Sequence, residues 1–249
     1  MIHRHFRTSR LDRTNRTRGE GSNIPPRTSH VRHRRGFTLI ETALATVIIG
    51  VGVLALVQAQ EAFLRSNSWS TQAATANYLA NEIRELTRRL PKYDPVNSLY
   101  VDASSTLRGW GPRASDVGPQ DFSYVLCFDN MRFAYNGSAG WADGNLPGPI
   151  DAFGTVIPDI DGNGNIRMDT SGKIIPLAGW TQEVHVAKVD PFNNSTTYAN
   201  SATLPANAGT GFKGLAIDKF PLRVTVIVFY RGPFDSSETE MARVSWIVP

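Results

Sequence analysis

The stretch RRGFTLIETALATVIIGVGVLALVQAQ, residues 34–60, decides the fold of this 249-residue chain. From Phe37 to Gln60 it contains one charged side chain, the carboxylate of Glu41. A helix needs about 20 consecutive apolar residues to cross a bilayer. The stretch therefore predicts a membrane-spanning helix over 37–60. The presence of this carboxylate requires an explanation, because inserting a charged side chain costs about 2.5–3.5 kcal/mol at mid-bilayer and less toward an interface.

Positive charge is concentrated ahead of this stretch. Residues 1–36 carry ten Arg against Asp12 and Glu20, a net charge of +8, so the remaining chain carries −4 of the total of +4. The first 36 residues also lack an apolar period, and we expect a basic, disordered leader. The acidic remainder has no general attraction for phosphate, so we expect no nucleic-acid partner.

The motif GFTLIE, residues 36–41, closely resembles the cleavage motif of type IV prepilins and type II secretion pseudopilins. The match combines a basic flank, a glycine, a phenylalanine, a carboxylate four positions further on and an uncharged span. The resemblance implies that a prepilin peptidase and methyltransferase cuts between Gly36 and Phe37. The leader 1–36 would then be removed, and Phe37 would become the N-methylated terminus.

The resemblance also implies a role for Glu41 in assembly. Cleavage creates an α-amino cation at Phe37, and the carboxylate can neutralise it in a medium of low dielectric constant. The pair can form within one helix or between two subunits of a filament. Alternatively, Glu41 caps the helix N-terminus, where the helix dipole favours negative charge. The two roles are compatible.

The residues before the apolar run predict the orientation of the chain in the membrane and suggest an alternative start. Arg32, Arg34 and Arg35 precede the apolar run, so the positive-inside rule places the N-terminus in the cytoplasm. The chain after about residue 60 would then be periplasmic or, after assembly, part of a filament. The leader is long for the family it resembles. Val31 offers an alternative start, because a GTG codon encodes valine internally and can initiate translation in bacteria.

A helical pattern continues beyond the membrane span. Apolar residues recur at steps of three and four, and Pro91 then ends the pattern. We predict one helix over 37–90, apolar all round in its first half and amphipathic in its second. The stripe consists of Trp69, Ala73, Ala76, Leu79, Ala80, Ile83, Leu86 and Leu90.

The remaining residues, 91–249, predict a β-rich head. β-branched and aromatic runs bounded by Gly, Pro, Asn and Asp are typical of strands, and the last two runs resemble a hairpin. A long helix against an antiparallel sheet is the α+β, pilin-like fold. Residues 136–179 predict an irregular, exposed insertion, and the single cysteine, Cys127, predicts a buried thiol. The predicted strands are 121–128, 131–135, 180–189, 221–232 and 241–248.

The segment PDIDGNGNIRMD, residues 158–169 within the insertion, resembles a calcium loop. Hard oxygen ligands that converge on a tight turn are what Ca²⁺ requires. The twelfth position of an EF-hand would be Thr170 rather than glutamate, so the segment resembles a truncated calcium turn. The alternative is an Asx-rich surface turn. The candidate ligands are Asp159, Asp161, Asn163, Asn165 and Asp169.

No motif assembles a catalytic site. GTGFKG, residues 209–214, matches the glycine pattern of dinucleotide sites but lacks the flanking strand and helix. His185, the one histidine after the leader, lies in a strand pattern without a partner motif. We therefore expect a protein that is not an enzyme.

The resemblance favours a structural subunit, a minor pilin of the PilV-like kind or a pseudopilin. Its partners would be the prepilin peptidase, other pilin or pseudopilin subunits and inner-membrane lipid. Two alternatives stay open: an adhesin or calcium-binding module at a filament tip, and a membrane-anchored periplasmic protein that does not assemble.

Overall fold

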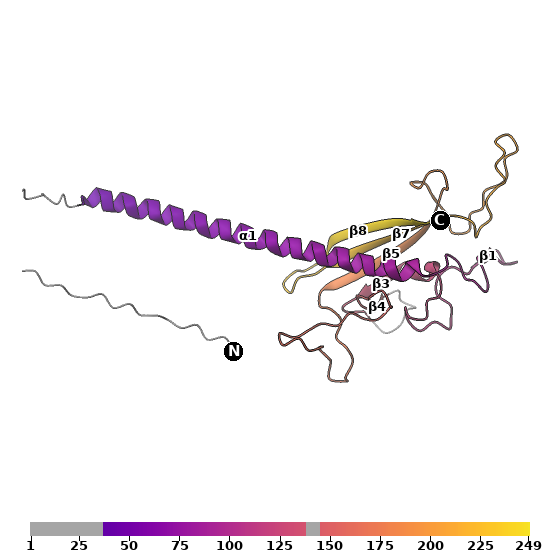
Figure 1. Cartoon of the computed structure of the whole chain (residues 1–249), viewed down its shortest axis with the longest axis horizontal. Coiled ribbons are helices and arrows are strands. Elements are labelled where there is room, and N and C mark those ends of the chain that lie inside the picture. Colours follow the sequence, from indigo (N-terminus) through magenta and orange to yellow (C-terminus); the bar gives the residue numbers. More distant parts are fainter. Residues whose placement is uncertain (1–36, 138–144) are drawn as a thin grey trace, which may run out of the picture. The chain divides into compact units, whose positions relative to one another are not determined.

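The computed structural model describes residues 37–137 and 145–249 of the chain (Figure 1). The chain divides into two compact units, Met1–Leu56 and Val57–Pro249. One helix, α1 (Leu39–Arg88), passes through the boundary between them. The strands of the described residues all belong to the second unit, which is called the head below.

Helix α1 can continue for 50 residues because none of them is proline and only two, Gly50 and Gly52, are glycine, the next least favourable residue in a helix. The helix ends two residues before the predicted Leu90, ahead of Pro91, which lacks the N–H that another turn needs. In the head, the amphipathic stripe is confirmed, with buried residues at steps of three and four. They are Ala76, Leu79, Ala80, Ile83 and Thr87.

Trp69 is a correction to the predicted stripe. Its side chain is 64% exposed, and the first buried residue of α1 lies two turns later, at Ala76. The indole continues the helical period, but it precedes the part of α1 that packs in the core. Periodicity thus identified the buried face of the helix and not the residue at which burial begins.

The head contains a sheet in the order β4-β3-β5-β7-β8 (Figure 1). The three long strands, β5 (Trp180–Val189), β7 (Leu222–Tyr230) and β8 (Thr239–Val248), are antiparallel neighbours and confirm the predictions for these ranges. The shorter strand β3 (Met131–Ala134) lies within the predicted range 131–135 and pairs antiparallel with β5.

Three further pairings were not predicted. Strand β4 (Asn145–Pro147) runs parallel to β3, so the sheet is mixed rather than fully antiparallel; a three-residue strand carries no pattern that sets its direction. Strand β6 (Thr197–Tyr198) pairs with the end of β5. Strands β1 (Tyr100–Val101) and β2 (Leu107–Arg108) form a separate hairpin.

The predicted strand 121–128 is wrong. Its second half is a 3-10 helix, Val125–Phe128, in which all four residues are buried. A strand would point alternate side chains to opposite faces, whereas this apolar run does not alternate and fits a tight turn inside the core. The Val125 N–H donates to the Pro91 carbonyl at 2.9 Å, which ties this turn to the end of α1.

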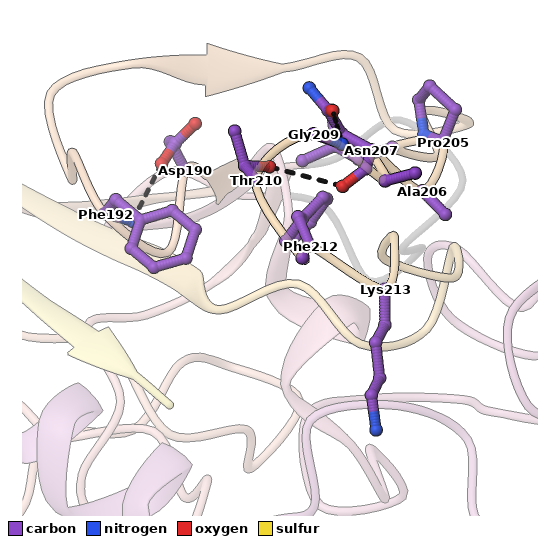
Figure 2. Close-up of a pocket in the computed structure, with 12 residues that line it drawn as sticks. Asp190, Phe192, Pro205, Ala206, Asn207, Gly209, Thr210, Phe212 and Lys213 are labelled. Carbon is purple, nitrogen blue, oxygen red and sulfur yellow. Dashed lines mark hydrogen bonds between the residues drawn. The ribbon is translucent and has the colours of Figure 1, made fainter.

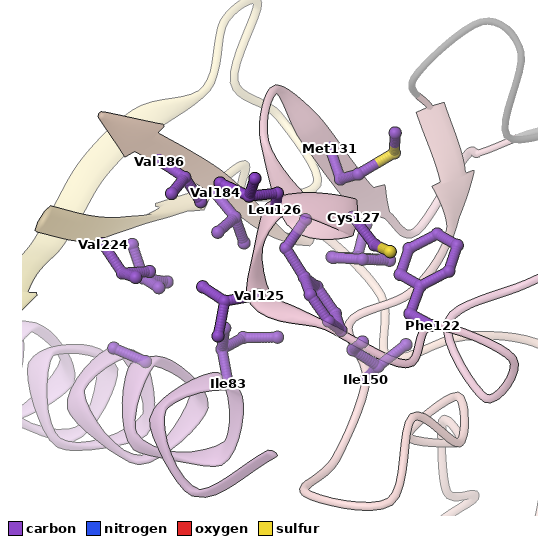
Figure 3. Packing of buried hydrophobic residues seen from close by; sticks show 14 of the residues in the cluster. Ile83, Phe122, Val125, Leu126, Cys127, Met131, Ile150, Val184, Val186 and Val224 are labelled. Atoms are coloured by element: carbon purple, nitrogen blue, oxygen red, sulfur yellow. The ribbon is translucent and has the colours of Figure 1, made fainter. Parts of the chain in front are cut away.

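The core of the head joins α1, the 3-10 turn and the inner face of the sheet (Figure 3). Ile83, Val125 and Val184 bring one side chain from each of these elements. Cys127 is fully buried, which confirms the predicted buried thiol, and burial raises its pKa to about 11. A thiol with a raised pKa is a weak nucleophile, so packing is its role.

One polar side chain, Gln182, crosses this core. Its Oε1 accepts from the Ile150 N–H at 2.8 Å, and its Nε2 donates to the carbonyls of Leu79 at 2.8 Å and Ile150 at 3.0 Å. Gln182 is fully buried. It therefore satisfies buried backbone groups that the sheet cannot reach and links α1 to the insertion.

Over its described part, the insertion 136–179 contains β4 and otherwise turns joined by isolated antiparallel bridges. Three segments of five residues, 151–155, 161–165 and 169–173, make the same turn and are called the Asp turns below. In each, the first residue is Asp, and its Oδ1 accepts the backbone N–H groups two and four residues on, at 2.8–2.9 Å.

Glycine at the fourth position of each Asp turn has a positive φ of 77–86°. L-residues rarely adopt this conformation, so the spacing D-x-x-G specifies the turn. Apolar residues flank each turn and pair across the hairpin: Ile150 with Val156, Ile160 with Ile166, and Met168 with Ile174.

Candidate membrane and assembly site

The start of α1 contains the residues that the sequence singles out. Phe37 and Thr38 are not helical, and the Thr38 carbonyl accepts the N–H groups of Glu41 at 3.0 Å and Thr42 at 3.2 Å. Glu41 thus lies in the first turn of the helix, where the dipole favours a carboxylate. Of the two residues at the predicted cleavage bond, the structure describes Phe37, and Gly36 lies outside the described residues.

Glu41 is exposed, and among the described residues its carboxylate has no hydrogen-bond or ion-pair partner. Its surroundings on the helix are apolar: Leu39 is 87% exposed, Ile40 77% and Leu44 62%. A carboxylate in such a setting gains most from a cation that arrives with a second molecule or from the chain terminus. No described group already performs that role.

The apolar segment that follows Glu41 is long enough to cross a membrane. Helix α1 contains the one candidate span of the described residues, and none of the apolar window is buried in the chain itself. Large side chains face outward along it, among them Val47, Ile49 and Leu54, each more than 60% exposed. A surface of this kind needs lipid or another apolar helix around it.

Comparison with protein families identifies this same segment. The family model described as "Prokaryotic N-terminal methylation motif" matches residues 31–57. The matched range contains Gly36, Phe37, Glu41 and most of the apolar run. This motif supports a type IV pilin-like character of the N-terminal segment. Neither a curated protein nor a solved structure matched the chain.

The pilin-like motif and the fold agree with each other. A long apolar N-terminal helix followed by a mostly antiparallel sheet is the pilin-like α+β architecture. The motif implies processing by a prepilin peptidase and assembly with other pilins, and with the apolar helix it fits membrane anchoring. The family is structural rather than enzymatic.

The residues predicted to bind calcium already have partners within the chain. The carboxylate of Asp161 accepts backbone N–H groups of its own Asp turn, which lowers its pKa. The carboxylate of Asp169 accepts from the Ser171 hydroxyl and from backbone N–H groups of its turn, which lowers its pKa as well. Asp159 instead accepts from Arg167 Nη1 at 2.7 Å. In the described residues, no three Asp, Glu, His or Cys side chains converge as a metal group would.

The two amide residues of that prediction, Asn163 and Asn165, serve the turn through their backbone N–H groups. The Asn165 Nδ2 also donates to Asp161 Oδ2 at 3.3 Å. These contacts are those of the alternative that the sequence left open, an Asx-rich surface turn. Calcium binding stays a prediction.

An open hollow in the head lies between the 190–192 turn and the 204–213 hairpin (Figure 2). Phe192 and Phe212 line it with rings 6.3 Å apart, edge to face. The GTGFKG segment forms part of this hairpin through the pair Asn207 and Phe212, and no helix follows it. The flanking elements of a dinucleotide site are thus absent from this described part of the chain.

Two polar residues of β5 take different positions. His185, on the outer face, is half-buried; its Nε2 lies 2.8 Å from Glu183 Oε1 and its Nδ1 lies 3.2 Å from the side-chain Oδ1 of Asn130. Lys188, on the inner face, is fully buried. The sequence reasoning missed Lys188, although the alternation with Val184 and Val186 places it on the core side.

Proposed function

We propose that the chain is a structural subunit, a minor pilin or pseudopilin, of a type IV pilus or a type II secretion pseudopilus. A prepilin peptidase would cut it between Gly36 and Phe37 and methylate Phe37. The observation that carries the proposal is Glu41: a carboxylate without a described partner, in the first turn of an unburied apolar helix, within the matched motif.

The proposal gives this carboxylate a partner. Cleavage leaves an α-amino cation at Phe37, one helical turn before Glu41. In a membrane or a helix bundle, where water is excluded, an unpaired charge is costly and a close opposite charge removes much of that cost. Pairing between the amine of one subunit and the carboxylate of the next would therefore favour correct axial position in a filament.

The apolar half of α1 supports the same function. Before assembly it would lie in the inner membrane, with the basic N-terminal side in the cytoplasm and the head in the periplasm. After assembly the same exposed side chains would pack against the helices of neighbouring subunits. One apolar surface thus serves both states, because lipid and other apolar helices cover it equally well.

The test is a pair of substitutions in the full chain, followed by fractionation of membranes and sheared filaments. Glu41→Ala should remain in the membrane and fall at least about tenfold in the filament fraction, since each subunit contact would leave one charge unpaired. Glu61→Ala is the matched control, because Glu61 is exposed on the same helix and pairs with Arg65. Equal assembly of both variants would contradict the proposed role of Glu41.

A further inference from the structure

The outer edge of the head sheet is formed by β8. This ten-residue strand pairs with β7 and, among the described residues, with no other strand. An edge strand presents unpaired N–H and C=O groups that another strand can bind. Natural sheets protect such edges with charges, prolines, bulges or a covering element.

The first half of β8 has this protection. A register irregularity at Val228 and Phe229 on β7 distorts the pairing there. Arg243 makes two contacts with Glu240, Nε to Oε1 at 2.9 Å and Nη2 to Oε2 at 2.8 Å, which place a charged group on the strand. These are the features that discourage pairing with a further strand.

The second half of β8, residues 244–248, has none of these features. Its sequence, VSWIV, contains no charge and no proline, and it has the β-branched and aromatic residues that strands favour. Val244, Trp246 and Val248 pack at the margin of the core and remain partly exposed. This edge is therefore able to accept a strand.

A groove of about 260 Å³ adjoins this open edge, between the end of β8 and the last turns of α1. Leu90, Trp246 and Val248 supply its apolar surface. Arg84 and Arg88 supply its charge: Arg84 has no ion-pair partner among the described residues, and Arg88 lies 3.7 Å from Glu85 with its side chain 77% exposed. The groove thus offers an apolar pocket beside two available guanidinium groups.

We propose that residues 244–248 of β8 bind an extended segment of a partner protein as an additional strand. Main-chain hydrogen bonds to the open edge would hold the segment, and one apolar side chain would enter the groove. A carboxylate two residues from that side chain, on the same face of the added strand, would pair with Arg84 and Arg88, which makes the partner acidic as well as apolar. This inference does not depend on processing at Phe37 or on filament assembly.

The test uses the full chain in detergent micelles and a fluorescein-labelled, end-blocked nonapeptide. The peptide alternates valine and threonine, with a leucine at its centre and a glutamate in place of the valine two residues further on, so that both side chains lie on one face of the strand. Fluorescence anisotropy should show binding, and hydrogen exchange at the amides of 244–248 should slow when the peptide is present. A second peptide, with proline in place of both the valines and the threonines, lacks the N–H groups for pairing along either edge and should not bind.

A charge reversal tests the acidic specificity. Arg84→Glu with Arg88→Glu should weaken binding of the first peptide at least about tenfold. Lys173→Glu with Lys213→Glu is the matched control, because both lysines are exposed on other parts of the head, and it should change affinity less than about twofold.

Four results would overturn the proposal: no binding of the first peptide, equal binding of the proline peptide, equal loss in both charge variants, or no protection of the β8 amides. A peptide-free chain that is already dimeric, with those amides protected, would also overturn it, because a second copy would then cover the edge.

Discussion

Lys188 shows at the residue scale how burial changes the chemistry of a side chain. Its Nζ lies 5.1 Å from the centre of the Phe220 ring and 3.5 Å from the Ala202 carbonyl oxygen. Burial lowers its pKa from 10.5 to about 8, and the charge of Asp218 opposes only part of that change. At neutral pH the head thus holds an ammonium group with few hydrogen-bond acceptors.

The lowered pKa predicts how stability depends on pH. Between about pH 8 and 10.5 the folded chain binds fewer protons at Lys188 than the unfolded chain, so the free energy of unfolding rises with pH in this window. Below pH 8 Lys188 is charged in both states, and its burial then lowers the free energy of unfolding by up to about 3 kcal/mol, at about 1.36 kcal/mol for each unit by which its pKa is lowered. Lys188→Met should therefore stabilise the head at pH 7, by about 1–3 kcal/mol.

Denaturant unfolding of both chains at pH 7 and pH 10 measures this effect. The advantage of Lys188→Met should shrink at pH 10, where most of the wild-type penalty is gone. If Lys188→Met raises the free energy of unfolding equally at pH 7 and pH 10, then packing, and not the charge of Lys188, accounts for the difference in stability.

Gln182 provides a second prediction at this scale. Gln182→Leu keeps the volume but leaves the buried Ile150 N–H without its acceptor, so we expect a loss of about 1–3 kcal/mol in the free energy of unfolding. Thr225→Val removes one exposed contact with Ser245 and should change it by less than about 0.5 kcal/mol. Urea denaturation measures both, and losses of equal size would contradict the role of the buried amide.

The elements differ in how well the sequence predicts them. Strands β5, β7 and β8 were predicted because alternation and β-branched residues agree over nine or ten residues. The range 121–128 was mistaken for a strand because a fully apolar run has no period, and tertiary packing then selects its conformation. Strand β4, with three residues, is too short for any pattern.

The Asp turns were visible in the sequence as a repeated D-x-x-G spacing, yet one of them was predicted as a calcium loop. An Asx turn and a calcium loop use the same residue types, since carboxylate oxygens bind either N–H groups or Ca²⁺. Sequence spacing cannot separate them. The structure shows which N–H groups the Asp161 carboxylate accepts.

A substitution pair separates the two readings of Asp161. Asp161→Asn retains an oxygen acceptor for the N–H groups of Asn163 and Asn165, whereas Asp161→Ala removes it. Hydrogen exchange at these two amides should therefore be near wild type in the first variant and faster in the second. Equal exchange in all three chains would contradict the turn. If calcium also binds, it should raise the Tm of the wild-type chain and not of Asp161→Asn.

At the scale of the whole molecule, the assembly site and the head differ in what the sequence reveals. Gly36, Phe37 and Glu41 could be predicted as site residues from the sequence because a membrane span and a cleavage motif depend on local composition and spacing. The open edge of β8 and the groove beside it depend on which strands pair and on residues as distant as Arg84 and Trp246. Such features become visible only when the chain is folded.

Processing between Gly36 and Phe37 is tested most directly by the mass of the N-terminal peptide of the chain, isolated from membranes of a cell with an active prepilin peptidase. We expect a terminus at Phe37 that carries one additional methyl group. A chain that retains the leader, or one cut beyond residue 60, would contradict it, because the apolar helix would then be a plain anchor or a discarded signal.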